Sequence, residues 1–296
     1  MKWIRRGHDA VCDSRSCGEC RNITDGRSLL TAAGIDALRC VTVVLFALVF
    51  PAVSAAQTEQ VDLELVLLVD ASNSIDKAET RFQRQGYAAA LIHPDVLGAI
   101  KAGPFGRVAV SFMEWADEDN QDIVVPWTVI DGLEAARALN DKLLSAPRMT
   151  YGSNAIGDAI AAAQSYIRTN PFDGVRKVID FSGDSANNWG GISIEEARDN
   201  ALAAGTIING LAIKCLDTDC GGRPVSYDLE EAFKTRIIGG PGSFVITVDS
   251  GQRFAEAVRR KLILELSDAG TADRFVERAS SGFPGKLVHV IHGAPR

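Results

Sequence analysis

The predicted fold follows from the ten residues LVLLVDASNS at positions 65–74, because an uninterrupted apolar run gives way at once to small polar residues. Five consecutive aliphatic residues suit a strand that is buried on both faces, as the strands of parallel sheets are. From Asp62 onward, short apolar runs alternate with helical patterns, which is typical of a sheet covered by helices on both sides. The sequence therefore predicts an α/β domain with a doubly wound, mostly parallel sheet whose central strand is 65–69.

The other expected elements follow from the same alternation of strand-like and helix-like periodicity. Further strands are expected at 107–113, 122–126, 175–181, 206–213 and 244–248. Helices are expected near 80–92, 133–143, 156–167 and 254–266, with one more from Ser193, where a capping box precedes it, to the residue before Gly205. The predicted domain spans 57–268, and the tail at 269–296 has no assigned structure.

The first 56 residues have the composition of an export signal. Arg39 precedes an apolar run at 41–49, and small residues follow up to Ala56. The run is about half as long as the roughly 20 residues of a membrane span, so cleavage near Ala56 is favoured over an uncleaved anchor. We expect a periplasmic or secreted protein. The cysteine-containing stretch before Arg39 is better explained by a start codon placed too early than by a metal site.

The charge of the chain excludes one class of partner, and its cysteines indicate an oxidising compartment. With a net charge of −7 and no run rich in Lys or Arg, the positive surface needed for nucleic acid is missing. Contact with a membrane is expected only through an uncleaved signal segment. Cys215 and Cys220 are close enough in sequence to close a small loop as a disulfide; half of a zinc site is the alternative, but no second ligand pair lies nearby.

The segment after the predicted central strand carries the chemistry. Asp70, Ser72 and Ser74 present a carboxylate and two hydroxyls at alternate positions, which are ligands that Mg²⁺ accepts, although the same residues also make turns and helix caps. Two more oxygen-rich loops, at 150–154 and 182–185, lie at equivalent ends of predicted elements. Because ligands collect beyond the carboxyl ends of parallel strands, we expect the three loops to converge.

This arrangement resembles the von Willebrand factor A family. Its metal-ion-dependent adhesion site uses Asp-x-Ser-x-Ser, a Thr from a second loop and an Asp from a third. The resemblance covers 62–268 and implies a metal-binding role for Asp70, Ser72 and Ser74, which match fully, and for Asp184. In the third loop, Ser-Gly-Asp-Ser replaces the usual Thr-Asp-Gly and shifts the register by one residue.

The second loop departs from the family pattern. Alignment through 155–159 puts Asn154 where Thr is expected, and Ser153 is the neighbour able to substitute. An amide oxygen can bind a hard cation, so the resemblance implies a site for Mg²⁺, or for Mn²⁺ or Ca²⁺. The stretches at 178–188, 238–244 and 260–265 resemble more closely an uncharacterised bacterial family of exported A-like proteins, a domain of unknown function.

The sequence leaves open two functions from different classes. In the first, an Asp or Glu from a protein partner completes the coordination of the cation, so the protein is an adhesion-type binding module. Asn187, Asn188 and Trp189 are then expected to line the crevice. In the second, Gly183-Asp184-Ser185 is the edge of a hydrolase with Ser185 as nucleophile. The absence of a histidine in a motif that would place it beside Ser185 favours binding over catalysis.

Overall fold

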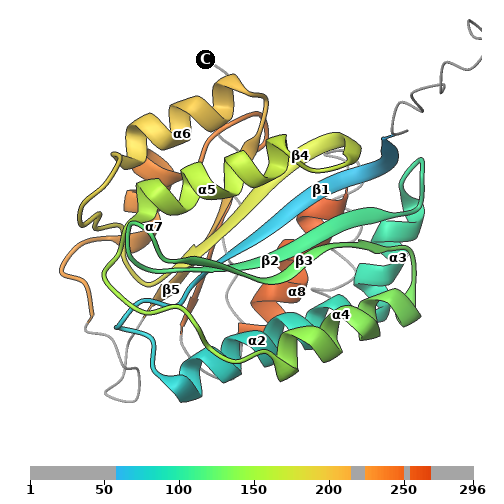
Figure 1. The fold of residues 1–296 in the computed structure, drawn as a ribbon, viewed down its shortest axis with the longest axis horizontal. Helices are drawn as coiled ribbons and strands as arrows, with labels where there is room; N and C mark the ends of the chain where they lie inside the picture. Colours follow the sequence, from blue (N-terminus) through green and yellow to red (C-terminus); the bar gives the residue numbers. More distant parts are fainter. Residues whose placement is uncertain (1–57, 215–223, 250–253, 268–296) are drawn as a thin grey trace, which may run out of the picture. The chain divides into compact units, whose positions relative to one another are not determined.

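The computed structural model describes residues 58–214, 224–249 and 254–267 (Figure 1). The predicted signal segment, Cys215, Cys220 and the tail at 269–296 lie outside these ranges, so their predictions stay untested. Among the described helices, none is long and apolar enough to cross a membrane.

The described strands form a six-stranded sheet in the order β3-β2-β1-β4-β5-β6. These strands are β1 (Glu59–Asp70), β2 (Val108–Trp115), β3 (Gln121–Ile130), β4 (Phe172–Gly183), β5 (Ile207–Lys214) and β6 (Val245–Asp249). All neighbours pair in parallel except β2 and β3, which are antiparallel. The mostly parallel sheet and the central position of β1 are therefore confirmed.

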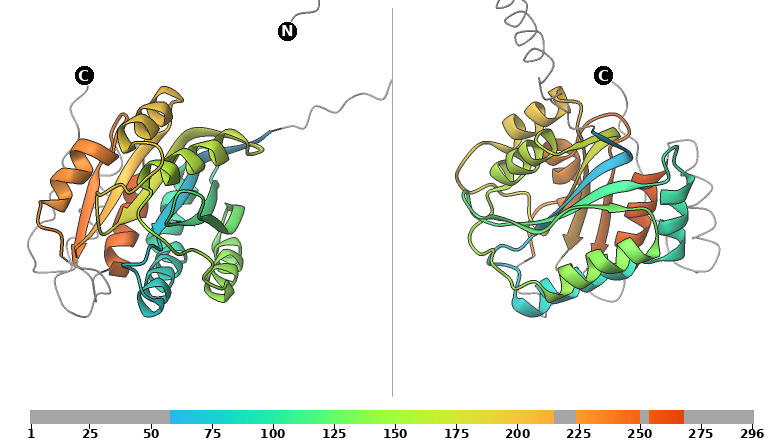
Figure 2. Two further views of the ribbon diagram at one scale, coloured as in Figure 1. Left: turned by 60° about the vertical axis from the view of Figure 1, so that its left-hand side comes forward. Right: turned by 45° about the vertical axis from the view of Figure 1, so that its right-hand side comes forward.

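Helices cover both faces of the sheet, as the two turned views show (Figure 2). One face carries α2 (Lys77–Leu91), α3 (Pro94–Ala102), α4 (Leu133–Ser145) and α8 (Phe254–Leu266); the other carries α5 (Ile156–Arg168), α6 (Ile194–Ala203), α7 (Leu229–Ala232) and the π-helical turn η1 (Phe233–Ile237). The side chains of β1 point alternately to the two faces of the sheet. Leu65 and Leu67 pack into the core on the first face, and Val66 and Leu68 pack into the core on the second. The doubly wound α/β prediction is confirmed.

Several elements differ from the expected ones. The structure adds α3, α7 and η1, which are too short to show a helical period in the sequence. Strand β4 begins at Phe172 rather than Val175, because its first residues pair with the start of β1. Ser193 does cap α6, where its hydroxyl accepts a hydrogen bond from the backbone N–H of Glu196 (3.1 Å).

A buried charge cluster lies between the sheet and α8. Lys261 Nζ is 2.6 Å from a carboxylate oxygen of Asp180 and 2.6 Å from one of Glu265, and all three residues are at most 1% exposed. Asn209 donates to the same Glu265 oxygen. Burial, followed by the charge of Asp180, raises the pKa of Glu265 to about 8. One ammonium thus serves two carboxyl groups without contact with water.

Candidate metal centre

The first loop begins where the central strand ends. Asp70 is 1% exposed, and its Oδ1 accepts a hydrogen bond of 2.8 Å from the backbone N–H of Ser72. The hydroxyls of Ser72 and Ser74 are 3.0 Å apart. The buried Oδ2 of Asp70 has no hydrogen-bond partner in the described structure. The alternating residues of the motif therefore do turn their oxygens to one side, and one carboxylate oxygen is left over.

The third loop brings a second carboxyl group to this point. Burial, and next the charge of Asp184, raises the pKa of Asp70 to about 8. Burial also raises the pKa of Asp184, while a hydrogen bond from Ser74 opposes the shift. A Cβ built on Gly183 would lie 3.3 Å from Asp70 Oδ2, so the loop backbone passes close by. Within the described ranges, no ion pair neutralises either carboxyl group.

The second loop is tied to the first through its backbone. The N–H of Asn73 donates to the carbonyl of Gly152 (2.9 Å), and the N–H of Gly152 donates to Asn73 Oδ1 (3.2 Å). Gly152 takes a φ of +136°, which few other residues adopt. Ser153 is exposed and Asn154 is half-buried. The three loops therefore converge as expected, with the side chains of these two residues left without a hydrogen bond among the described contacts.

Thr150, in the same loop, is a candidate that sequence reasoning missed. It is fully buried, and its hydroxyl has no hydrogen-bond partner among the described residues. A buried hydroxyl without a hydrogen-bond partner is unfavourable unless a ligand or a water molecule binds to it. The A-domain pattern has a Thr in this loop, so the residue type could have identified Thr150. The alignment through 155–159, however, assigns the Thr position to Asn154 instead.

Arg148 is the second residue that the sequence did not reveal. Its guanidinium donates hydrogen bonds to the carbonyls of Ala71 (2.7 Å), Ser72 (3.1 Å) and Ile75 (2.7 Å), and its Nε donates to the carbonyl of Thr150 (3.0 Å). A rigid planar group with several donors suits such a set of acceptors. Arg148 thus holds the backbone of the first loop in place and joins it to the second.

Replacing Arg148 by Met is expected to weaken Mg²⁺ binding at least tenfold while the domain stays folded, because the first loop loses the donors that fix its shape. Calorimetric titration measures the affinity, and circular dichroism checks the fold. The matched control is Arg168→Met, since Arg168 is exposed at the end of α5. Equal affinities for the two variants would show that Arg148 does not position the site.

The predicted crevice residues fall into two groups. Asn188 accepts a hydrogen bond from the Gly157 N–H (3.0 Å) and donates to the carbonyls of Gly190 and Ile192 (3.0 Å each), so its side chain holds the loop against α5. Trp189 is 64% exposed, and Asn187 is exposed as well. The side chain of Asn188 therefore stabilises the loop, whereas the side chains of Asn187 and Trp189 are exposed and accessible to a partner.

Among the described hydrogen bonds, the Ser185 hydroxyl contacts no histidine, carboxylate or amine that would act as the base of a hydrolase. The Ser185 hydroxyl accepts from the Asn187 N–H (3.0 Å) and lies 3.4 Å from the hydroxyl of Tyr227. His93 is the one histidine of the described ranges, and it caps α3 by accepting from the Asp95 N–H. A histidine engaged at that helix end gives Ser185 no partner for proton transfer.

The oxygen atoms gathered here fit a divalent cation. The unpartnered Asp70 Oδ2 and the uncompensated pair of Asp70 and Asp184 are the features that a positive ion would satisfy. The described residues contain no cluster of three or more Asp, Glu, His or Cys side chains able to hold a metal. Hydroxyls and water would therefore supply much of the coordination, which Mg²⁺ tolerates.

The fold and the three converging loops define a von Willebrand factor A-like domain. The chain belongs to the family described as protein of unknown function (DUF1194), which matches residues 60–270. No curated protein matches the chain.

Many solved structures are similar to this chain, including the following two. Proximal thread matrix protein 1 from the mussel byssus, described with a zinc-occupied MIDAS motif, has a TM-score of 0.51 at 13% identity, covering 70% of this chain and 48% of that chain. The conserved hypothetical protein BatB from Bacteroides thetaiotaomicron has a TM-score of 0.44 at 17% identity, covering 69% and 98%. The chain thus spans about half the length of the mussel protein.

Proposed function

We propose that this protein is an exported, metal-dependent binding module that captures a protein partner through an Asp or Glu side chain. The observation that carries the proposal is the buried Asp70 Oδ2, which has no partner in the described structure and lies beside a second carboxyl group, Asp184. Export rests on the sequence of residues 1–56 alone.

Each residue has a distinct role in the proposed site. Asp70 and Asp184 supply negative charge, and Ser72 and Ser74 supply neutral oxygens already oriented toward each other. Asn154, Ser153 or Thr150 provides the contribution of the second loop. A bound cation would offer one open position to a carboxylate and thereby contribute much of the affinity.

Mg²⁺ is the proposed ion, with Mn²⁺ and Ca²⁺ as alternatives. Two carboxyl groups and several hydroxyls suit a small hard cation that keeps some of its water, whereas Ca²⁺ takes six to eight oxygen ligands. We prefer binding to hydrolysis because the one histidine of the described ranges caps α3 and Ser185 has no histidine, carboxylate or amine among its described hydrogen-bond partners.

The first test is calorimetric titration of the purified protein with Mg²⁺ and Mn²⁺. Saturable binding is expected for the wild type and is expected to be lost in Asp70→Ala, since the variant removes a charged ligand. Asp131→Ala is the matched control, because Asp131 is exposed and lies outside the three loops of the proposed site. Retained binding in a folded Asp70→Ala variant would refute the site.

Partner capture provides the second arm of the same test. Immobilised wild-type protein should retain partners from the exported fraction in the presence of Mg²⁺ and release them when the ion is chelated. Asp70→Ala should retain none of them. Capture that survives both chelation and Asp70→Ala would mean that partners bind elsewhere on the domain.

A further inference from the structure

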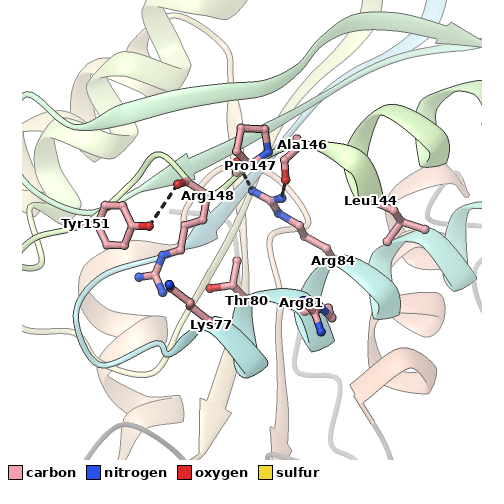
Figure 3. A pocket seen from close by; sticks show the side chains of 9 residues that line it. All are labelled: Lys77, Thr80, Arg81, Arg84, Leu144, Ala146, Pro147, Arg148 and Tyr151. Atoms are coloured by element: carbon pink, nitrogen blue, oxygen red, sulfur yellow. Dashed lines mark hydrogen bonds between the residues drawn. The ribbon is translucent and has the colours of Figure 1, made fainter.

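We propose that a basic pocket beside the first loop binds the phosphate group of a small organic phosphate monoester. The pocket has a volume of about 370 Å³ and lies between α2 and the segment after α4 (Figure 3). Its lining contains four cationic side chains and no carboxylate; the residues are Lys77, Thr80, Arg81, Arg84, Leu144, Ala146, Pro147, Arg148 and Tyr151.

Three of the four positive charges are not neutralised. Arg84 is paired with the buried carboxylate of Glu114 through contacts of 2.7 and 2.9 Å. Arg148 donates only to backbone carbonyls, so its charge persists. Lys77 and Arg81 are exposed and take part in no ion pair within the described ranges. In a chain with a net charge of −7, such a concentration of positive charge is unusual.

The donors that would meet a ligand are side chains rather than a free helix end. Asp76 caps α2 and accepts hydrogen bonds from the N–H groups of Ala78 and Glu79, so these amides are occupied. The hydroxyl of Thr80 donates to the Asp76 carbonyl (2.8 Å). In this part of the described structure, the ammonium of Lys77 and the guanidinium of Arg81 are therefore the donors available to a ligand. The positive charge of Arg148 also attracts an anion to the pocket.

The charge count favours a doubly charged oxyanion over a carboxylate. A phosphate ester carries about −1.5 to −2 at neutral pH and offers three acceptor oxygens. Arg and Lys are the side chains that bind such groups most effectively. A single carboxylate would leave most of the positive charge of Lys77, Arg81 and Arg148 uncompensated.

The size and walls of the pocket indicate that the anion carries an organic part. A volume of about 370 Å³ lies within the usual range of small-molecule sites, roughly 300–1,000 Å³, and exceeds what a bare oxyanion fills. Leu144, Ala146 and Pro147 contribute apolar side chains to the lining. The alkyl portion of an ester would rest there while its oxyanion faces Lys77 and Arg81.

The test is calorimetric titration of the full chain with glycerol 3-phosphate, inorganic phosphate and sulfate at low ionic strength, after divalent cations have been removed. One equivalent of the ester should bind, and more tightly than inorganic phosphate. The double variant Lys77→Gln/Arg81→Gln should bind it at least tenfold more weakly. Because no divalent cation is present, the result is independent of the proposed metal centre.

The matched control is Lys101→Gln/Arg137→Gln, which removes the same residue types and the same charge from exposed positions on α3 and α4. This control should bind the ester as the wild type does. Three results would each overturn the proposal: no saturable binding of any probe, an equal loss in both double variants, or equal affinity for the ester and for the bare ions.

Discussion

Lys261→Met is expected to lower the free energy of unfolding by about 3–5 kcal/mol at pH 8, the range found when one partner of a buried ion pair is removed. Lys261 Nζ is 2.6 Å from both Asp180 and Glu265, and all three residues are at most 1% exposed. The variant would leave two carboxyl groups in the core without a positive charge, and a buried negative charge without a partner is strongly unfavourable.

The stability loss of Lys261→Met should depend on pH in a defined direction, which a loss of packing alone would not explain. The pKa of Glu265 is already raised to about 8 in the folded protein. A carboxyl group with a raised pKa contributes its stability fully below its ordinary pKa and loses it as the pH rises toward 8. The defect of Lys261→Met should therefore shrink as the pH is lowered from 8 to 5, where Glu265 is protonated in both proteins.

Lys234→Met is the matched control. Lys234 Nζ is also 2.6 Å from a glutamate oxygen, that of Glu230, but these side chains are 26% and 27% exposed. An ion pair in contact with solvent is worth about 0–1 kcal/mol, so this variant should change stability little. Urea denaturation at pH 5 and 8 measures both variants; equal losses for the two, or a Lys261→Met loss that does not vary with pH, would contradict this explanation of the cluster.

Gly157→Ala is expected to destabilise the domain by about 2–3 kcal/mol, in the range found for overpacked interiors. A Cβ at this position would overlap the carbonyl oxygen of Ile192 and lie 2.9 Å from that of Ser193. Both are backbone atoms, so they cannot move aside as a flexible side chain would. The segment that Asn188 ties to the Gly157 N–H would have to leave α5.

This displacement should also reach the proposed metal centre, because the displaced segment continues directly from the loop that holds Asp184. Gly98→Ala is the control: Gly98 lies in α3, where an added Cβ would have nothing within 4 Å, and Ala is favoured over Gly in a helix interior by about 0.5–1 kcal/mol. Thermal denaturation and Mg²⁺ titration measure both effects. A Gly157→Ala protein as stable as the wild type would show that the close contact is not maintained in solution.

Much of the fold could be predicted because each deciding signal is local. The aliphatic run 65–69 marked the central strand, and the helix that begins near Ile156 showed a clean apolar period. The short α3 and α7 showed none, since nine and four residues give too few repeats. Their helical state depends on the layers that they cover rather than on their own periodicity.

The candidate site divides in the same way. Asp70, Ser72 and Ser74 could be identified because alternate residues after a strand turn to one side, whatever the rest of the chain does. Arg148 could not be identified in this way, because the carbonyls to which it donates are about 75 residues away in sequence. A backbone carbonyl accepts a hydrogen bond from any suitable donor, so it does not indicate which side chain will bind it. The same holds for Lys77 and Arg81, which line a pocket only because α2 packs beside the end of α4.

The amino-acid sequence alone was enough for the class of fold, the strand that organises it and the residue types at its carboxyl edge, since these follow from hydrophobic periodicity and from short-range spacing. The three-dimensional arrangement was needed to show which polar atoms are buried without a partner in the described structure, such as Asp70 Oδ2 and the Thr150 hydroxyl. It was needed equally to show which charges share one core, such as Asp180, Lys261 and Glu265. Burial and electrostatic pairing depend on distances in space, and these are set by all layers of the domain together.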